Sequence, residues 1–212
     1  MKPIMLTRSE ERLLASLDTP YKIQSFLFTI PYSEDDFYRC PLRVLRDRKG
    51  HCFDGALFAA MALRRIGYPP LIVELIPNAR DDDHLLALFK GQGLWGAIAQ
   101  SNFNGLRYRE PVYRTVRELV MSYFEDYFNA AGEKTLTGYR GPINLKVFDR
   151  LDWMTSDSGL EAVATGMDRY RIQPVLTAIQ AARLSRADDR AVAAGLLGSN
   201  PEGLFKLPKG SS

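Results

Sequence analysis

One segment constrains the fold of this chain more than any other. It is an amphipathic helix, predicted over residues 53–66, which a cysteine precedes and helix breakers follow. Apolar side chains recur along it at helical spacing, at Phe53, Ala56, Leu57, Ala60 and Met61. Gly67 ends the helix, and the prolines at 69 and 70 prevent its continuation. Such a helix must bury its apolar face against a second layer of structure.

Short apolar runs after the helix predict that second layer. Residues 71–76 form a largely apolar run between breakers, which predicts a buried strand. A second strand is predicted over 84–90 and a third over 94–99, with a glycine-rich turn at 91–93 between them. Strands joined by so short a turn pair antiparallel. We therefore expect an α+β fold, in which the helix that carries Cys52 packs on a small, mainly antiparallel sheet.

Further elements are predicted on both sides of this core. Helices are expected over 20–30, over 115–130, from 158, over 174–184 and over 187–197, with a short strand over 143–148 and irregular structure over 32–50. The core should bury Phe53, Leu57, Ala60, Met61, Ile72, Val73, Leu86, Leu88, Val120 and Phe124. Because no repeat or composition shift marks a linker, we expect a single domain over 1–212, with a core at 40–105 and a helical extension containing a short strand over 115–212.

Charge and hydropathy exclude several classes of function. Among 212 residues, 28 are Lys or Arg and 25 are Asp or Glu, so the net charge is only +3. A charge this small argues against a dedicated nucleic-acid or anionic-membrane binder. No uncharged apolar run approaches the roughly 18 residues of a membrane helix, and charged residues interrupt the region where a signal peptide would be apolar. We expect a cytoplasmic protein without nucleic-acid or membrane partners.

Cys52 is the first candidate for chemistry, because it opens the predicted helix directly after Gly50 and His51. The positive end of a helix dipole stabilises a thiolate, so this position predicts a thiol with a lowered pKa that acts as a nucleophile. Gly50 would let the chain turn and keep the sulfur accessible. The alternative is a small buried apolar residue, which most free cysteines are. Cys40 is expected to be ordinary.

His84 is the second candidate, since a nucleophilic cysteine needs a base within hydrogen-bond reach and histidine is the usual choice. It starts the second strand, where alternation places it on one face with Leu86 and Leu88. The alternative is a structural histidine at a strand edge. Asp82 and Asp83 are expected to form a solvated turn, although they could also hold the imidazole.

Metal and cofactor sites are not expected. Four possible zinc ligands, Cys40, His51, Cys52 and His84, match no compact zinc-binding spacing. No glycine-rich phosphate loop occurs. Cations and aromatic residues alternate over 107–117, as in single-strand nucleic-acid binders, but the acidic residues among them favour a solvated face.

Two motifs carry a family resemblance. The sequence GHCFDGA over 50–56, followed by LRRIGYPP over 63–70, resembles the core motif of the transglutaminase-like superfamily, and of a bacterial-type branch of it. That motif is a cysteine opening a helix, a Leu-Arg pair, a glycine, a proline and an apolar strand. The superfamily shares a papain-like fold with a cysteine nucleophile, and its histidine lies on the next strand, where His84 stands. The resemblance covers about residues 40–105.

The third member of the triad departs from the family pattern. The resemblance implies an aspartate four residues after the tryptophan matched by Trp95, but Ala99 stands there. An asparagine can orient a catalytic imidazole, as papain-like proteases show, so Asn102 is the expected substitute, with Ser101 and Asn104 as weaker choices. The resemblance then implies amide or peptide hydrolysis, or acyl transfer, through Cys52, His84 and Asn102. The alternative functions are a decayed binding module that lacks the third member and a purely structural domain.

Overall fold

The computed structural model describes residues 5–206, and within them six strands form one antiparallel sheet, so the α+β fold class is confirmed. The strand order is β4-β3-β2-β1-β5-β6. The strands are β1 (Leu71–Pro77), β2 (His84–Gly91), β3 (Leu94–Ile98), β4 (Arg109–Tyr113), β5 (Leu136–Asn144) and β6 (Gln173–Pro174). The helices are α1 (Arg8–Ser16), α2 (Pro20–Phe28), α3 (Pro41–Asp47), α4 (Cys52–Arg65), α5 (Val116–Met121), α6 (Leu160–Met167), α7 (Ala178–Ala181) and α8 (Asp189–Gly195).

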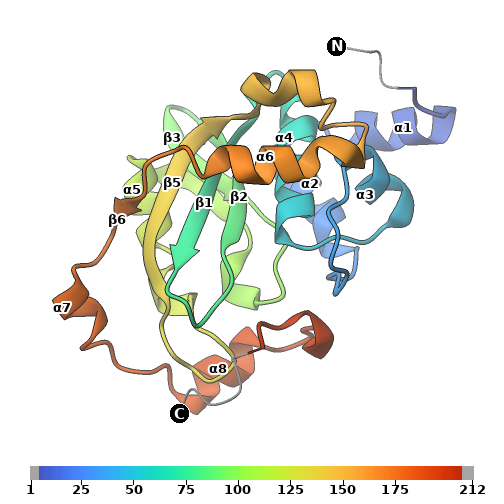
Figure 1. Cartoon of the computed structure of the whole chain (residues 1–212). Coiled ribbons are helices and arrows are strands. Elements are labelled where there is room, and N and C mark those ends of the chain that lie inside the picture. Colours follow the sequence, from blue (N-terminus) through green and yellow to red (C-terminus); the bar gives the residue numbers. More distant parts are fainter. Residues whose placement is uncertain (1–4, 207–212) are drawn as a thin grey trace.

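Helix α4 is the centre of the first layer, which lies beside the sheet with α2 and α3 (Figure 1). Every residue from Phe53 to Leu63 is buried, because α4 packs between the sheet and the neighbouring helices. Side chains of β2 that point to this layer are Leu85, Ala87 and Phe89. Their removal from water provides much of the stabilisation, about 1.5–3 kcal/mol for each fully buried large apolar side chain. We call this side of the sheet the α4 face.

The opposite side of the sheet, which we call the α5 face, carries a separate apolar cluster. Leu86 and Leu88 of β2 point to this side, where they pack with Leu119 and Val120 of α5 and with Tyr123. Alternation along β2 therefore divides its side chains between two layers. His84, two residues before Leu86 and paired with Leu75, belongs to the α5 face.

Asp54 fixes the N-terminus of α4. Its side chain is fully buried, and its carboxylate accepts hydrogen bonds from the Arg39 amide at 2.7 Å and the His51 amide at 3.2 Å. The first of these bonds joins the segment before α3 to the first turn of α4. At Gly55, a Cβ would lie 2.3 Å from the Cβ of Gln100, so only glycine lets α4 approach the loop after β3 this closely. These contacts hold Cys52 at one fixed end of the helix.

The predictions near α4 are accurate, whereas several later ones are wrong. The three strands after α4 are confirmed within one or two residues. The strand predicted over 143–148 lies earlier in the chain, as β5, and residues 145–151 form a 3-10 helix that the Asn144 side chain caps. Instead of a helix over 174–184, there is the end of β6 and the four-residue α7. Residues 32–50, predicted to be irregular, contain α3.

The helix predicted over 115–130 is also shorter than expected. After α5 ends at Met121, the Ser122 hydroxyl donates to the Leu119 carbonyl at 2.6 Å, and the Arg109 guanidinium binds the Ser122 carbonyl at 3.1 Å. These bonds take backbone and side-chain groups that a continuing helix would use. Of the ten residues predicted to be buried, nine are, and Phe124 is half-buried against the cluster on the α5 face.

Candidate active site at Cys52

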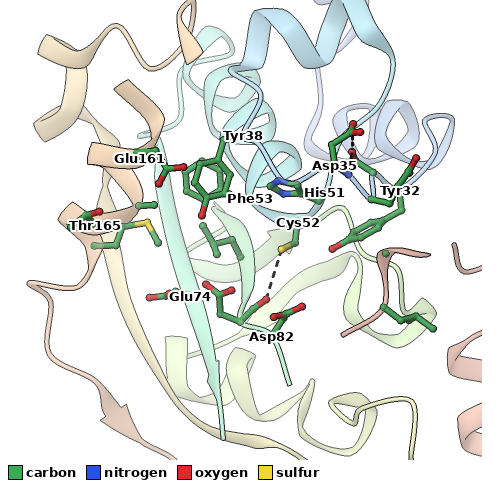
Figure 2. Close-up of a pocket in the computed structure, with 18 of the residues that line it drawn as sticks. Tyr32, Asp35, Tyr38, His51, Cys52, Phe53, Glu74, Asp82, Glu161 and Thr165 are labelled. Carbon is green, nitrogen blue, oxygen red and sulfur yellow. Dashed lines mark hydrogen bonds between the residues drawn. The ribbon is translucent and has the colours of Figure 1, made fainter. Parts of the chain in front are cut away.

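A cavity of about 530 Å³ opens at the N-terminus of α4, and we call it the thiol pocket. Its walls come from segments far apart in the sequence: the loop at 32–38, the start of α4, Glu74 of β1, residues 82–85, α6, and residues 202–204. Figure 2 shows the sulfur of Cys52 between the ring of Tyr32 and the carboxylates of Glu74 and Asp82. The expected accessible cysteine at a helix start is therefore present.

The sulfur of Cys52 lies against the backbone edge of β2. Strand β3 ends at Ile98, opposite Ala87, and leaves the earlier residues of β2 without a neighbour on that side. The thiol occupies this place: it donates to the Asp83 carbonyl at an Sγ–O distance of 3.8 Å, and the Leu85 amide also contacts the sulfur. Its two backbone contacts thus lie on either side of His84.

The thiol is not the thiolate that the helix position predicts. Burial raises the pKa of Cys52 to about 12, and the nearby Asp83 carboxylate acts in the same direction, while the Tyr32 hydroxyl and the Leu85 amide act against them. A helix N-terminus lowers a thiol pKa, whereas burial away from water raises it. In this pocket, desolvation dominates, and at neutral pH Cys52 is a protonated thiol.

His84 has one defined hydrogen bond, from its Nε2 to the Leu106 carbonyl at 2.8 Å. A carbonyl oxygen can only accept, so Nε2 must carry the proton. Burial lowers the pKa of His84 to about 4, which leaves the ring neutral at pH 7 and its Nδ1 unprotonated. Within residues 5–206, no hydrogen bond joins the imidazole to the Cys52 thiol. The ring is thus held neutral with an unprotonated Nδ1, but His84 is not among the described residues that line the thiol pocket.

Asn102 does not take the place expected for it. Its Oδ1 accepts from the Asn200 amide at 2.7 Å, and its Nδ2 donates to the Asn200 carbonyl at 2.8 Å, so the carboxamide is used to hold the C-terminal segment. The weaker choices do not contact His84 either, since the Ser101 hydroxyl accepts from Phe103 and the Asn104 amide binds Ala194 and Leu197. The group that orients His84 is the main-chain carbonyl of Leu106.

Tyr32 is a site residue that the sequence did not indicate. It lines the thiol pocket, and its hydroxyl forms a hydrogen bond with Cys52 that lowers the thiol pKa. Burial raises the pKa of Tyr32 itself, so the phenol stays protonated and can donate. No local motif marks this tyrosine, which follows Pro31 in a loop twenty residues before the cysteine.

His51, the second histidine, lines the thiol pocket and has a structural role at the start of α4. It is the N-cap residue of α4, and its ring meets Tyr38 edge to face at a centroid distance of 5.5 Å. Its Nε2 is 3.6 Å from an oxygen of Asp54, and burial lowers its pKa to about 4.

The thiol pocket is strongly acidic. Eight carboxylates line it, at Glu34, Asp35, Glu74, Asp82, Asp83, Glu161, Asp168 and Glu202. Some are neutralised by neighbours, as Glu74 is by Arg140 at 2.9 Å. Burial and the nearby Asp83 still raise the pKa of Glu74 to about 7. Within the described residues, no three acidic, histidine or cysteine side chains are grouped as metal ligands. In residues 5–206, no helix has the length and apolarity needed to cross a bilayer.

Comparisons with known proteins give no family assignment. No family model and no curated protein matches this chain. Among solved structures, it is similar to Legionella pneumophila LapG in an EGTA-treated form, with 18% identity and a TM-score of 0.35, over 44% of this chain and 59% of that one. The calcium-bound form gives 19% identity and a TM-score of 0.34, over 44% and 60%. The chain thus spans under two thirds of LapG, and so low a TM-score supports no conclusion about function.

Proposed function

We propose that this protein carries out acyl chemistry on an amide or peptide bond, with Cys52 as the nucleophile and His84 as the base. The hydrogen bond from His84 to the Leu106 carbonyl is the observation that carries the proposal. It fixes the tautomer whose Nδ1 is free to accept a proton, on a residue whose two backbone neighbours contact the thiol. The carbonyl then does for His84 what an aspartate or asparagine does in a triad.

The reaction begins from a neutral pair. As Sγ attacks the carbonyl carbon of the substrate, the thiol proton passes to Nδ1 of His84, and the substrate oxygen becomes an oxyanion. Collapse of this intermediate breaks the C–N bond, and His84 returns the proton to the leaving amine. Water then loses a proton to His84 and attacks the thioester, which releases the acid and restores the thiol. An amine in place of water would give acyl transfer.

Two donors are placed to stabilise the oxyanion. One is the backbone amide of Cys52, at the first turn of α4, where no helical carbonyl pairs with it. The other is the Tyr32 hydroxyl, which already donates toward the sulfur. The proposal requires two movements: the Cys52 side chain rotates away from the Asp83 carbonyl, and the His84 imidazole, which lies on the α5 face outside the lining of the thiol pocket, moves toward the sulfur. Catalytic hydrogen bonds are often long before substrate binds.

The transglutaminase-like superfamily is part of this proposal. It is supported by the motif at 50–56 and by the order of elements, since a helix opened by a cysteine is followed by antiparallel strands with a histidine on the second.

A binding module without catalysis is the second candidate. The observations that favour it are the raised pKa of Cys52 and its hydrogen bond to Asp83 instead of to an imidazole. In that case, the acidic thiol pocket would hold a peptide or amide without cleaving it.

Acylation by p-nitrophenyl acetate separates the two candidates. We expect a burst of one p-nitrophenolate per chain, with the acetyl group on the Cys52 peptide by mass spectrometry. The burst should vanish in Cys52→Ala and persist in Cys40→Ser, the matched control at the other, buried cysteine. Equal slow reaction of the wild type and Cys52→Ala would contradict catalysis and leave the binding module.

A further inference from the structure

Arg107 is a half-buried cation without an anionic partner. It lies between the 3-10 turn at Asn104–Leu106 and β4. Its guanidinium makes no hydrogen bond and no ion pair within residues 5–206, and its Nε is fully buried. It lies near the ring of Phe28, whose centre is 5.6 Å from the guanidinium carbon.

Other buried and half-buried arginines of this protein are paired. Arg39 binds Asp35 and Asp47, Arg109 binds Asp126, and Arg140 binds Glu74. A charge that leaves water without a partner costs free energy, so buried cations are normally matched with anions. Desolvation lowers the pKa of Arg107, and no carboxylate opposes it. Arg107 therefore lacks the anionic partner that the other arginines have, and a bound anion would supply it.

Arg107 lines a cavity of about 390 Å³, which we call the Arg107 pocket. A volume of this size suits a small ligand. The walls are the end of α2 and the loop at 27–32, the loop at 100–102, and the C-terminal segment at 198–200. No carboxylate is among the described residues that line it, whereas eight line the thiol pocket.

The remaining polar groups of the Arg107 pocket define what could bind. The carboxamides of Gln100, Asn102 and Asn200 are already hydrogen-bonded to the main chain. The hydroxyls of Ser101 and Ser199 are free to donate, since the Ser101 hydroxyl only accepts, from the Phe103 amide, and the Ser199 hydroxyl forms no hydrogen bond within the described residues. Leu27, Phe28 and Pro31 supply an apolar wall.

We propose that the Arg107 pocket binds a carboxylate attached to a small apolar group. A guanidinium presents two parallel N–H donors that match a carboxylate, and one positive charge balances one negative charge. A phosphate dianion would bring a second charge, and no second cation lines the pocket. The free C-terminus of a peptide and a small organic acid share this chemistry. The site is independent of catalysis at Cys52, although Tyr32 lines both pockets.

Titration with N-acetyl-leucine tests the site. N-acetyl-leucinamide is the control without a charge, and inorganic phosphate is the control with a different anion. By calorimetry, we expect the acid to bind and the amide and phosphate to bind at least tenfold more weakly. Acetate that binds as well as N-acetyl-leucine would indicate a small acid without the apolar contact and would contradict the apolar part of the proposal. Tighter binding of phosphate, or no binding of the acid, would overturn the carboxylate assignment.

Two variants locate the site. Arg107→Gln should weaken N-acetyl-leucine binding at least tenfold, while Arg65→Gln, at an exposed arginine, should leave it unchanged. Without ligand, Arg107→Gln should keep or raise the Tm, because it removes an unpaired cation. A clear loss of Tm would show that the guanidinium is structural and would contradict the proposal. In the wild type, the NMR signal of the Arg107 Nε–H should shift when N-acetyl-leucine is added. An unchanged signal would also contradict the proposal.

Discussion

The two faces of the sheet contribute differently to the candidate active site. On the α4 face, the site residue is a side chain at the end of a long buried helix, and Asp54 holds that end in place. On the α5 face, the site residue is His84 at the start of a strand, held by a main-chain carbonyl from a short 3-10 turn. The thiol reaches only the main chain beside His84, at the Asp83 carbonyl and the Leu85 amide, while the His84 ring lies on the other face.

This difference separates the proposed nucleophile from the proposed base. A sheet normally separates the side chains of its two faces, and His84 does not line the thiol pocket. Because β3 is short, the sulfur contacts the main chain on either side of His84. The proposed nucleophile is positioned by the first layer and the proposed base by the second, so each can be disturbed separately.

The largest expected effect tests which layer supplies the base. His84→Gln should slow acylation of Cys52 by p-nitrophenyl acetate by about 10²–10⁴-fold, the usual contribution of a general base. His51→Gln is the matched control, because this histidine lines the thiol pocket, as His84 does not, and belongs to the α4 face. A larger loss with His51→Gln in stopped-flow measurements would show that the base comes from the first layer.

The next effect concerns the ionisation of the thiol. A thiol pKa of about 12 instead of 9 leaves about a thousandfold less thiolate at pH 7. Iodoacetamide, which gains nothing from an oxyanion site, should therefore alkylate Cys52 at least about a hundredfold more slowly than N-acetylcysteine at pH 7. The rate should still be rising at pH 10. Mass spectrometry of the Cys52 peptide measures this rate. If Cys52 is alkylated faster than N-acetylcysteine is, Cys52 is the thiolate that the helix position predicts.

These two predictions also show how far the sequence leads. The helix that carries Cys52, the three strands after it and the position of His84 follow from periodicity, breakers and the family motif. The partner of His84 could not be predicted, because a main-chain carbonyl such as that of Leu106 is present at every residue and leaves no pattern. A search among side chains led to Asn102, which the fold uses elsewhere.

Other failures have a local physical cause. Strand β5 contains Gly138, Gly141 and Pro142, which are typical of turns, and it tolerates them because its pairing with β1 is irregular. Tyr32 could not be linked to Cys52 from the sequence, since only the packing of the loop after α2 brings them together. The pKa of the Cys52 thiol depends on its burial in a pocket whose walls come from six segments. The position of Cys52 at a helix start does not predict this burial.

A smaller effect tests the anchor of the first layer. Asp54→Ala should lower the free energy of unfolding by about 2–6 kcal/mol, because it leaves one buried and one part-buried amide unsatisfied at a cost of about 1–3 kcal/mol each. Asp54→Asn, whose oxygen can still accept, should lose less. Urea denaturation followed by circular dichroism gives both values. Equal losses would mean that the charge of Asp54, and not its two accepted bonds, stabilises the end of α4.

The smallest effect tests the second layer. The Tyr127 hydroxyl donates to the Asp82 carbonyl at 2.8 Å and so holds the loop before β2. Tyr127→Phe removes one hydrogen bond and should cost about 1 kcal/mol in the same denaturation experiment. A loss as large as that of Asp54→Ala would place the stability of the site mainly in the α5 face. Tyr123→Phe, at a neighbouring buried tyrosine whose hydroxyl donates to the Arg107 main-chain carbonyl at 2.8 Å, is a suitable control.

Asn200 has a consequence for anyone who shortens or labels this chain near its end. Its amide and side chain bind Asn102, Tyr32 and Glu34, so one residue fastens the last described segment to two loops that lie far from it in the sequence. Residues 198–200 form a wall of the Arg107 pocket, and residues 202–204 form a wall of the thiol pocket. Loss of the residues from Gly198 onward, by deletion or by proteolysis, would thus remove a wall from both cavities in a single step. Cys52 and Arg107 would remain in the chain.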